Sequence, residues 1–431
     1  MKIAVIGSGG REHAICYALS KSPKATEIYC LPGNAGIGRI ATCVDIKVMD
    51  FEAIVDFCVK NAIDLAIVAP DDPLVGGLVD KLQEAGIKAF GPEKKAAILE
   101  GSKAFSKDLM KKYNIPTAKY ENFTNLDEAI KYLDNVDYPI VIKADGLALG
   151  KGVLICQTHD EAVEALKEMM EGHKFGDAGN TVVIEEFMTG REVSVLSFCD
   201  GKTIKILSSA QDHKRAKDND EGLNTGGMGT FSPSPFYTDE INEFCMENIF
   251  KPTVKAMEAE GRTFKGVIFF GLMITKDGPK VLEYNARFGD PEAMNVLPLL
   301  ETPLIDVCKA IVDGTLDEVE FKPKASVCKY IVPDGYPETE YAGELIEVDE
   351  KAIEEMGAKV FYAAVSLEDD GIHLSGSRAL GIVASGETIT EAEEIAEKAC
   401  EYVKGNVYHR RDVGTKELVE KRVEHMKEIL N

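Results

Sequence analysis

The sequence predicts a multidomain protein of mixed α/β and α+β class, and three observations lead to this prediction. The chain has 431 residues, which suggests about three domains of roughly 100–200 residues each. Its first hundred residues alternate short apolar runs with helix-like segments, a pattern typical of a parallel sheet with crossover helices. Beyond residue 322, four strand-like runs with one N-capped helix indicate a small α+β domain.

The first unit, residues 1–101, is therefore expected to be an α/β domain with a parallel sheet. Its predicted strands are 2–6, 27–31, 65–69 and 87–90, and its predicted helices are 11–21, 51–61 and 74–85. Ligands of such sheets bind beyond the carboxyl ends of the strands. The residues at those ends are Gly7 to Arg11, Pro32 to Asn34 and Pro70 to Asp72.

The second unit, residues 102–321, mixes helices and strands, and the third covers residues 322–431. In the second unit we expect helices at 103–113, 126–134, 160–171, 239–260, 292–300 and 303–313, and strands at 140–143, 153–156, 181–187, 191–199, 203–211, 266–275 and 280–284. Ser102 and Asn125 are suitable N-caps for the first two helices. In the third unit we expect strands near 326–332, 343–348, 359–366 and 380–385 and a helix from Thr390 to about 403.

Composition excludes several classes of protein. Apolar residues make up 45% of the chain, and no run approaches the roughly 20 apolar residues of a membrane span. The start of the chain lacks the apolar run of a signal peptide, so we expect a cytoplasmic protein. The ten cysteines form no C-x-x-C pair. A formal net charge of -24 should repel nucleic acid and anionic membranes, so any phosphate site must be built locally.

Residues 140–153 are the strongest functional signal. A β-branched run delivers Lys143, three glycines follow at Gly146, Gly150 and Gly152, and Lys151 lies between the last two. Glycines let backbone N–H groups approach a ligand closely, and lysines add point positive charges. The pattern fits a phosphate chain without being a Walker-type loop, because no Gly-Lys-Ser/Thr opens a helix here. The alternative is a glycine-rich hairpin with solvated lysines.

A second glycine-rich turn, Gly7-Ser8-Gly9-Gly10, follows the first strand and opens a helix, so it suits an anion. Glu12 stands where a dinucleotide fingerprint needs its third glycine, and Pro32-Gly33-Asn34 lacks the acid that would bind an adenosine ribose. These departures argue against a nicotinamide cofactor. They favour a small phosphorylated or sugar-bearing ligand, or a tight turn with none.

Acidic and amide residues follow two later strands. Alternation places Glu283 and Asn285 on one strand face, where their oxygens suit Mg²⁺, and Arg287 beyond them could grip a carboxylate or phosphate. A structural turn is the alternative there. Glu185 and Glu186, with Glu192 beyond them, could bind an adenine amino group or ribose hydroxyls, or could be solvated acids of an edge strand.

The polar stretch 212–230 has no periodicity and is predicted to be a lid or substrate loop, with a disordered surface loop as the alternative. We expect His213 within it to be solvated or structural rather than a general base.

Taken together and in this order, these motifs resemble the phosphoribosylamine–glycine ligases (glycinamide ribonucleotide synthetases) of the ATP-grasp superfamily. The matching segments are Gly7 to His13, Pro32 to Gly36, Leu99 to Phe105, the 140–153 loop, Gln211 to Lys214, Asn224 to Gly229 and Arg287 to Glu292. Departures are Asp71 in place of a glutamate, Met294 in place of a polar residue, and Leu374 to Arg378 in place of a Gly-Gly-Arg pattern.

The resemblance implies an ATP-grasp fold for the second unit, with a mobile lid at about 118–190, and it implies roles for named residues. Lys103 and Lys143 would contact ATP phosphates under the loop 145–152, which includes Gly146, Gly150, Lys151 and Gly152. Glu185, Glu186, Phe187 and Glu192 would hold adenine and ribose, and Glu283 and Asn285 would ligate Mg²⁺ or Mn²⁺. Gly9, Gly10, Arg11, Gly33, Asn34 and Asp71 would face phosphoribosylamine, with Ser375, Gly376 and Arg378 at its 5-phosphate. Asp212 and Arg287 would hold the amine and carboxylate of glycine.

The implied reaction is ATP-dependent ligation of glycine to 5-phosphoribosylamine through glycyl phosphate, a step of purine biosynthesis. Arg287, Lys143 and Asp212 are its expected catalytic residues, and no covalent enzyme intermediate is expected. The alternatives are another ATP-grasp ligase or carboxylase, a nicotinamide-dependent dehydrogenase and a non-catalytic relative. The expected partners are small molecules, with no nucleic acid or membrane; the oligomeric state stays open, with a monomer plausible.

Overall fold

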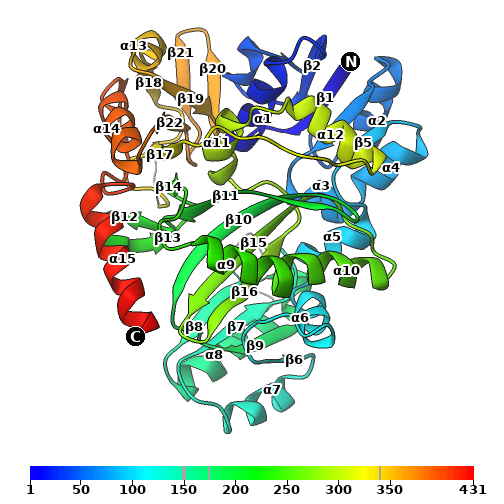
Figure 1. The fold of residues 1–431 in the computed structure, drawn as a ribbon, viewed down its shortest axis with the longest axis vertical. Coiled ribbons are helices and arrows are strands. Elements are labelled where there is room, and N and C mark those ends of the chain that lie inside the picture. The colour runs from blue at the N-terminus through cyan, green and yellow to red at the C-terminus, as the bar shows by residue number, and fades with distance from the viewer. Residues whose placement is uncertain (148–151, 173–174, 339–340) are drawn as a thin grey trace.

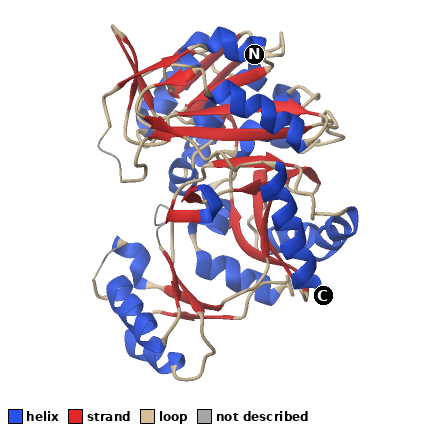
Figure 2. Ribbon diagram, turned by 90° about the vertical axis from the view of Figure 1, so that its left-hand side faces the viewer, coloured by secondary structure: helices blue, strands red, loops and turns tan. Residues whose placement is uncertain are grey.

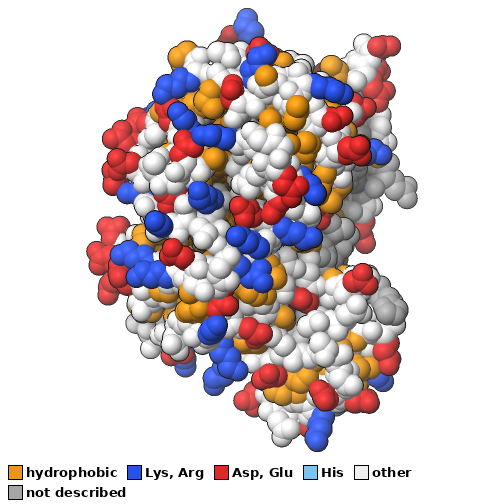
Figure 3. Space-filling view, turned by 90° about the vertical axis from the view of Figure 1, so that its right-hand side faces the viewer, with side chains coloured by type: hydrophobic (Ala, Val, Ile, Leu, Met, Phe, Trp, Pro, Cys, Tyr) orange, Lys and Arg blue, Asp and Glu red, His pale blue; other side chains and the backbone are white. Residues whose placement is uncertain are grey.

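The computed structural model describes residues 1–147, 152–172, 175–338 and 341–431. Figure 1 shows the N-terminal unit in blue beside the C-terminal unit in orange, with the green central strands beneath both and a cyan lobe at the far end. Over the described residues, no helix is long and apolar enough to cross a membrane. Acidic and basic side chains are interspersed on the face that Figure 3 shows, so the net charge of -24 is not gathered there in one patch.

The N-terminal unit contains the predicted parallel sheet, in strand order β3-β2-β1-β4-β5. The strands are β1 (Lys2–Gly7), β2 (Glu27–Pro32), β3 (Thr42–Cys43), β4 (Leu65–Val68) and β5 (Lys88–Phe90), and every pairing is parallel. The helices are α1 (Gly10–Ser20), α2 (Phe51–Lys60), α3 (Asp71–Gly76), α4 (Leu78–Glu84) and α5 (Lys94–Gly101). The order places the ends of β1 and β4 side by side, which is where ligands of such sheets bind.

Two details of this unit differ from the prediction. The helix expected at 74–85 is two helices, because Gly77 between α3 and α4 takes φ +96°, a left-handed conformation that interrupts the helix. The two-residue strand β3 and the helix α5 were not predicted.

A nine-stranded sheet forms the centre of the molecule, in the order β16-β15-β10-β11-β14-β17-β22-β19, with β24 paired to β17. Its members are β10 (Arg191–Asp200), β11 (Ile204–Asp212), β14 (Gly229–Ser232), β15 (Lys265–Thr275), β16 (Gly278–Asn285), β17 (Ala325–Pro333), β19 (Ala358–Tyr362), β22 (Leu380–Gly386) and β24 (Val407–Tyr408). The sheet crosses residue 322, so the second and third units share backbone hydrogen bonds. The division into 1–101, 102–321 and 322–431 remains a prediction.

Helices cover the central sheet on both faces. They are α6 (Lys103–Lys112), α9 (Asp239–Cys245), α10 (Lys251–Ala259), α11 (Glu292–Val296) and α12 (Leu304–Asp313), with a π-helical turn η5 (Met246–Phe250) joining α9 to α10 and a 3₁₀ turn η6 (Leu297–Leu299) after α11. The helices expected at 239–260 and 292–300 are thus present with a change of winding inside each. Ser102 caps α6 by accepting a hydrogen bond from the Phe105 N–H.

The lobe at the far end of the molecule contains its own four-stranded sheet, ordered β6-β9-β7-β8. It consists of β6 (Tyr120–Phe123), α7 (Leu126–Leu133), β7 (Ile140–Ala144), β8 (Val153–Cys156), α8 (His159–Met170), η3 (Gly176–Asn180) and β9 (Val182–Glu186). Figure 2 shows this lobe standing apart from the rest, and its buried side chains form a separate apolar core. Since β9 lies between β6 and β7, it is not an edge strand. Lid motion of the lobe remains a prediction.

The stretch 212–230, expected to be one long loop, contains a hairpin of β12 (Arg215–Lys217) and β13 (Glu221–Asn224) around the 3₁₀ turn η4 (Asp218–Asp220), and the start of β14. The C-terminal unit adds a four-stranded sheet, β20-β21-β18-β23. Its remaining elements are β18 (Leu345–Val348), α13 (Glu350–Glu355), β20 (Val365–Glu368), β21 (Gly371–Leu374), α14 (Ile389–Cys400), β23 (Val403–Lys404) and α15 (Lys416–Leu430). The strand expected at 359–366 is divided between β19 and β20.

Candidate active site

The register of the central sheet brings the predicted metal and glycine residues onto one face. Glu283 lies opposite Gly271, and Gly271 lies opposite Ser194 on its other side. Ser194 lies opposite Ala210, two residues before Asp212. Directly paired residues share a sheet face, as do residues two apart along a strand. Glu283 and Asp212, 71 positions apart in sequence, therefore project from the same face.

Glu283 and Asn285 fit a divalent cation by their chemistry. The Asn285 Nδ2 atom donates to Glu100 Oε1 at 3.1 Å, which leaves the Asn285 Oδ1 oxygen as a donor for a metal. Burial opposes ionisation of Glu283, but the nearby Lys214 and Lys143 outweigh it and hold its pKa below the ordinary value. An ionised carboxylate beside an amide oxygen is a hard, oxygen-only donor set.

Three lysines lie next to this face. Lys143 Nζ lies 3.0 Å from Glu185 Oε1, and Lys107 Nζ lies 3.0 Å from Glu185 Oε2. The side chains of these two lysines and of Glu185 are buried. Lys103 Nζ donates to the Gly146 carbonyl at 2.6 Å. Burial lowers the pKa of Lys107 to about 8 and also lowers that of Lys103. The structure thus places both predicted phosphate lysines together and adds Lys107, which lies one helical turn after Lys103.

Glu185 is held by these lysines, and the other predicted adenine and ribose residues also have protein partners. Glu186 Oε1 accepts a hydrogen bond from the Lys119 N–H at 3.0 Å, and Glu192 pairs with Lys214 Nζ at 2.9 Å. Phe187 is exposed. Nucleotide contact by these four residues remains a prediction.

The glycine loop is closed at its base, where the Ala144 N–H donates to the Gly152 carbonyl at 2.8 Å. Asp145 accepts hydrogen bonds from Ser102 Oγ and from the Ala104 N–H, both at 3.1 Å, which ties the loop to the start of α6. Gly150 and Lys151 lie outside the described residues.

Arg287 has one N–H group without an acceptor. Its Nη2 atom lies 3.2 Å from Glu100 Oε1, and its Nη1 atom donates to the Phe288 carbonyl at 3.1 Å. Its Nε atom is buried, lies 4.0 Å from Asp71 Oδ2 and has no hydrogen-bond acceptor among the described residues. Glu100, which was not predicted as a site residue, therefore orients both Asn285 and Arg287. Burial raises the pKa of Glu100.

Asp212 ends β11, and its carboxylate accepts a hydrogen bond from the His213 N–H at 2.7 Å. His213 itself is fully buried with its Nδ1 atom 3.0 Å from the Gly229 carbonyl oxygen. Burial lowers the pKa of its imidazole well below the ordinary value. Of the two predicted roles for His213, solvated or structural, the structure supports the structural one.

The N-terminal glycine turn corrects one expectation. We expected the N–H groups at the start of α1 to suit an anion of a ligand, but Glu12 Oε2 accepts the Gly9 N–H at 2.7 Å and supplies that anion from the chain itself. Arg11 is bound to the same carboxylate, with Nη2 2.7 Å from Glu12 Oε1. A Cβ on Gly10 would lie 2.7 Å from the Tyr330 hydroxyl, so this glycine is required by packing.

The Asn34 side chain is also engaged within the protein. Its Nδ2 atom donates to the carbonyls of Ser8 and Tyr362, both at 2.8 Å, and its Oδ1 atom accepts the N–H groups of Gly36 and Ile37 at 3.0 Å. An amide has two donors and two acceptor positions, so no capacity remains for a ligand. The expected contact of the Asn34 side chain with a substrate is therefore corrected. Gly33 beside it takes φ +73° and donates its N–H to the Gly7 carbonyl at 3.0 Å.

The predicted 5-phosphate residues are not joined to one another by hydrogen bonds. Ser375 Oγ donates to the Ala364 carbonyl at 2.7 Å, and Gly376 takes φ +84° beside it. Arg378 instead turns toward the central sheet, where Nη1 donates to the carbonyls of Gly227 and Asp290 at 3.1 and 3.2 Å. Its guanidinium also lies 4.5 Å from the Tyr330 ring centroid.

Asp290, which sequence reasoning left unassigned, connects three parts of the chain. Its carboxylate accepts the Tyr330 hydroxyl at 2.7 Å and the Arg11 N–H at 3.4 Å and lies 3.6 Å from Arg378 Nη1. Burial opposes its ionisation, but Arg378 and Arg11 hold its pKa below the ordinary value. Its place in the Arg287–Glu292 motif was the available signal.

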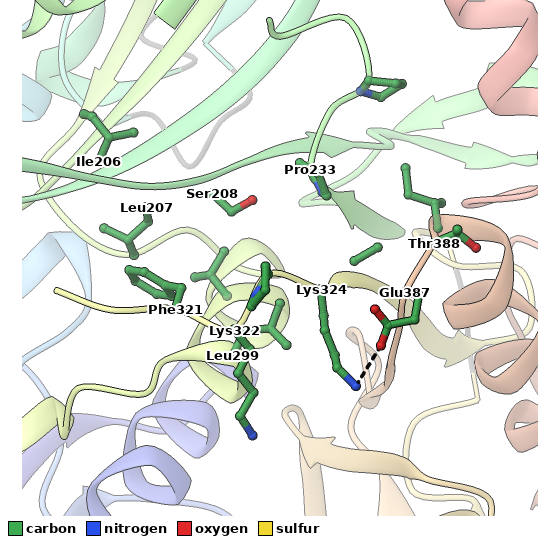
Figure 4. Close-up of a pocket in the computed structure, with 15 residues that line it drawn as sticks. Ile206, Leu207, Ser208, Pro233, Leu299, Phe321, Lys322, Lys324, Glu387 and Thr388 are labelled. Atoms are coloured by element: carbon green, nitrogen blue, oxygen red, sulfur yellow. Dashed lines mark ion pairs between the residues drawn. The ribbon is translucent and has the colours of Figure 1, made fainter. Parts of the chain in front are cut away.

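Two other features lie apart from these residues. A cavity of about 590 Å³ between β11, the 321–325 segment and the start of α14 is shown in Figure 4, and none of the predicted site residues lines it. Glu368, Asp370 and His373 bring ligand atoms within 4.8 Å of one another on the β20–β21 hairpin, but the two acids are exposed.

Comparison with known proteins gives a consistent result over the whole chain. Family models of phosphoribosylglycinamide synthetase match the N domain at residues 1–100, the ATP-grasp (A) domain at 101–293 and the C domain at 326–416. A phosphoribosylamine–glycine ligase from Methanobrevibacter smithii is 52% identical over 442 aligned positions that cover all of both chains. One from Caldanaerobacter subterraneus is 45% identical over 96% of this chain and 99% of that protein.

Solved structures agree. The crystal structure of phosphoribosylamine–glycine ligase from Thermotoga maritima superposes with a TM-score of 0.84 at 32% identity, covering 96% of this chain and all of that one. The biotin carboxylase domain of Hydrogenobacter thermophilus 2-oxoglutarate carboxylase, solved with MgADP, has a TM-score of 0.76 at 16% identity and covers 100% of this chain and 98% of its own. The second likeness shows the fold alone.

Proposed function

This chain belongs to the phosphoribosylglycinamide synthetase family, and we propose that it is the ATP-dependent ligase that joins glycine to 5-phosphoribosylamine. The observation that carries the proposal is the row of registered residues that places Glu283, Asn285 and Asp212 on one sheet face. Arg287 follows at the end of that row, and its Nε–H has no acceptor among the residues that the structure describes. One face thus offers groups for a phosphate-bound cation, an ammonium and a carboxylate.

The ATP phosphates would lie against Lys103 and Lys143, with Lys107 and Glu185 fixing the position of Lys143. Members of the ATP-grasp family use ATP with a divalent metal, and in this chain Glu283 and Asn285 would hold it, as Mg²⁺ or Mn²⁺. When bound, that cation neutralises phosphate charge. The protein contribution is a buried, preorganised set of cations aimed at the phosphates, which stabilises developing charge without reorganisation.

Glycine would lie between Arg287 and Asp212. The free Arg287 Nε donates to its carboxylate, and Asp212 receives its ammonium. Glu100 keeps the guanidinium plane fixed through Nη2, and the Nε–H group next to it would meet the substrate. Phosphoribosylamine would approach from the N-terminal unit, past Asp71 and the backbone of Gly33.

The chemistry then follows in two steps. A glycine carboxylate oxygen attacks the γ-phosphorus of ATP, forming a P–O bond while the bond to the ADP oxygen breaks. The amine of phosphoribosylamine attacks the carbonyl carbon of glycyl phosphate, a C–N bond forms, and phosphate leaves as the nitrogen loses a proton. The products are glycinamide ribonucleotide, ADP and phosphate. Positioning supplies much of the rate, because both steps join bound groups.

The test is ADP formation by the purified full chain with Mg²⁺, ATP, glycine and phosphoribosylamine generated in place. ADP release should require both substrates, and omission of either should abolish it. Removal of the divalent cation with a chelator should stop the reaction, and Mg²⁺ or Mn²⁺ should restore it. ADP release that depends on bicarbonate and not on glycine would instead identify a carboxylase, the class with which this chain shares only its fold.

A further inference from the structure

The turn that follows β2, residues 33–39, is held by the C-terminal unit as well as by its own domain. Tyr362 is the last residue of β19 and lies 328 positions after Asn34 in sequence. Strand β19 is the last strand of the nine-stranded sheet, and Tyr362 is paired there with Leu380 of β22. A strand at the edge of a sheet has backbone groups left for a further partner. At Tyr362 these groups bind the N-terminal unit.

The two backbone groups of Tyr362 bind two different segments of that unit. The Tyr362 N–H donates to His13 Nδ1 in α1 at 2.8 Å, and the Tyr362 carbonyl accepts a hydrogen bond from Asn34 Nδ2 at 2.8 Å. Asn34 in turn shapes the turn itself, because its Oδ1 atom accepts the N–H groups of Gly36 and Ile37 at 3.0 Å. One residue of the C-terminal unit therefore fixes α1 and the turn relative to each other.

The Tyr362 ring occupies the space that a side chain at position 36 would need. A Cβ on Gly36 would lie 2.2 Å from Tyr362 Cδ2 and 2.7 Å from His13 Cε1, distances that real Cβ contacts essentially never show. Tyr362 is 1% exposed, and the His13 ring stacks on it with the two centroids 6.1 Å apart. Close packing of this kind leaves no room for the turn to shift toward the ring. The ring thus sets how near the turn comes to β19.

The hydroxyl end of Tyr362 extends the same contact to the surface. The hydroxyl donates to Glu350 Oε1 at the start of α13, and Arg39 Nη1 at the end of the turn pairs with that same oxygen. The Arg39 guanidinium also lies 5.5 Å from the Tyr362 ring centroid, within cation–π range. The side chains of Arg39 and Glu350 are 49% and 29% exposed, so water screens their ion pair. The buried ring is therefore the stronger part of the contact.

We propose that Tyr362 is a positioning residue for phosphoribosylamine, because its ring and its backbone groups set the place of the turn at residues 33–36. This inference rests on the proposed function, in which phosphoribosylamine approaches past the backbone of this turn, and deepens it. Tyr362 is buried, so it acts through the turn. The subsite for phosphoribosylamine is then built by the N-terminal and C-terminal units together, whereas glycine and ATP bind at residues of other elements.

The decisive variant is Tyr362→Ala, with Tyr402→Ala at an exposed tyrosine of the same unit as the matched control. Tyr362→Ala should raise KM for phosphoribosylamine at least 10-fold and leave KM for glycine and for ATP within about 3-fold. Tyr402→Ala should leave all three KM values unchanged. A merely structural role would lower the fraction of folded enzyme, and hence turnover, without changing the KM of one substrate.

Two further variants keep the test decisive where Tyr362→Ala does not fold. Tyr362→Phe keeps the ring and both backbone hydrogen bonds, so KM for phosphoribosylamine should stay within about 3-fold of the wild-type value. Gly36→Ala disturbs the same contact from the side of the turn, because its methyl group would overlap the Tyr362 ring. It should raise KM for phosphoribosylamine alone, again at least 10-fold.

Combining the two changes tests whether they act through one contact. In a Tyr362→Ala background the ring is gone, so Gly36→Ala should have an effect at least 3-fold smaller than in the wild type. Unchanged KM for phosphoribosylamine in both single variants, an equal rise of all three KM values, or fully additive effects in the double variant overturns the positioning role and leaves the proposed function intact. Wild-type protein without glycine-dependent ADP formation overturns the proposed function itself.

Discussion

The glycine-rich turn before α1 and the loop after β7 look alike in sequence, yet the fold treats them differently. At α1 the chain supplies its own anion, because Glu12 accepts the Gly9 N–H and pairs with Arg11. After β7 the loop meets an excess of cations, with Lys143 and Lys107 sharing the single carboxylate of Glu185. Glycines thus indicate only that the backbone comes close to another group. Buried charges without a full set of opposite charges indicate where a ligand binds.

The same contrast separates Asn34 from Arg287. All four hydrogen-bonding positions of the Asn34 side chain are used within the protein, whereas the buried Arg287 Nε atom finds no acceptor in the described part of the chain. A satisfied amide stabilises a turn. A buried donor without an acceptor lowers folding stability until a ligand accepts its hydrogen bond. Such a donor therefore indicates a ligand site.

The largest effect is expected for the affinity for ATP when Lys143 is replaced. Lys143→Met removes the one cation that pairs with Glu185 Oε1 and that would also contact the phosphates. Loss of one partner of a buried ion pair lowers folding stability by about 3–5 kcal/mol. Affinity for ATP, measured by equilibrium titration, should fall by at least 100-fold. Lys112→Met on the same helix as Lys107, exposed and paired with Glu260, is the control and should leave ATP affinity unchanged. Equal affinities in the two variants would remove the phosphate role of Lys143.

Glu12→Gln should show the opposite behaviour. It breaks a buried pair with Arg11, with side-chain exposures of 11% and 2% for Arg11 and Glu12, and should destabilise the N-terminal unit by about 3 kcal/mol. ATP affinity should not change, because the carboxylate serves the turn and not the nucleotide. Urea unfolding and ATP titration of the same preparation measure both quantities. A Glu12→Gln variant with unchanged stability and weaker ATP binding would contradict the structural role of Glu12.

Arg287→Ala should raise KM for glycine roughly 10- to 100-fold, as expected for a charged hydrogen bond of about 1.5–3 kcal/mol. Steady-state ADP release at saturating ATP measures this. Arg287→Lys keeps the charge but not the fork, so it should recover only part of the loss. Unchanged KM and turnover in Arg287→Ala would refute the carboxylate contact.

The smallest expected effect is the pH dependence of folding stability that His13 in α1 causes. The buried His13 accepts the Tyr362 N–H at Nδ1 at 2.8 Å, and burial lowers its pKa to about 4. The unfolded chain takes up the proton near pH 6.5, so stability present above that value is lost as pH falls toward 4. At pH 5 the loss is about 2 kcal/mol. Urea midpoints of wild type and His13→Gln should converge on acidification; parallel curves would contradict this.

Sequence reasoning was most successful where local patterns carry the information. Alternating apolar runs predicted the parallel N-terminal sheet. The family resemblance assigned Lys103, Lys143, Glu283 and Asn285 to one site; Lys103 lies near Lys143 and Glu283 in the structure, and the ligand contacts of all four residues remain predictions. Sequence reasoning was weaker wherever a partner comes from far along the chain. Glu100 binds Asn285 and Arg287 from 185 positions away or more, and no local pattern signals such a contact.

The family, the parallel sheet and the residue types needed for the reaction could all be predicted without coordinates, because periodicity and motif order are read directly along the chain. Which of those groups already have hydrogen-bond or charge partners within the protein depends on how the chain folds. Strand register carried Asp212, Ser194 and Glu283 onto one face, helix packing brought Glu292 beneath it, and the start of α1 closed on Glu12. Burial then set the cost of every unpaired charge, since that cost depends on how far a group is removed from water.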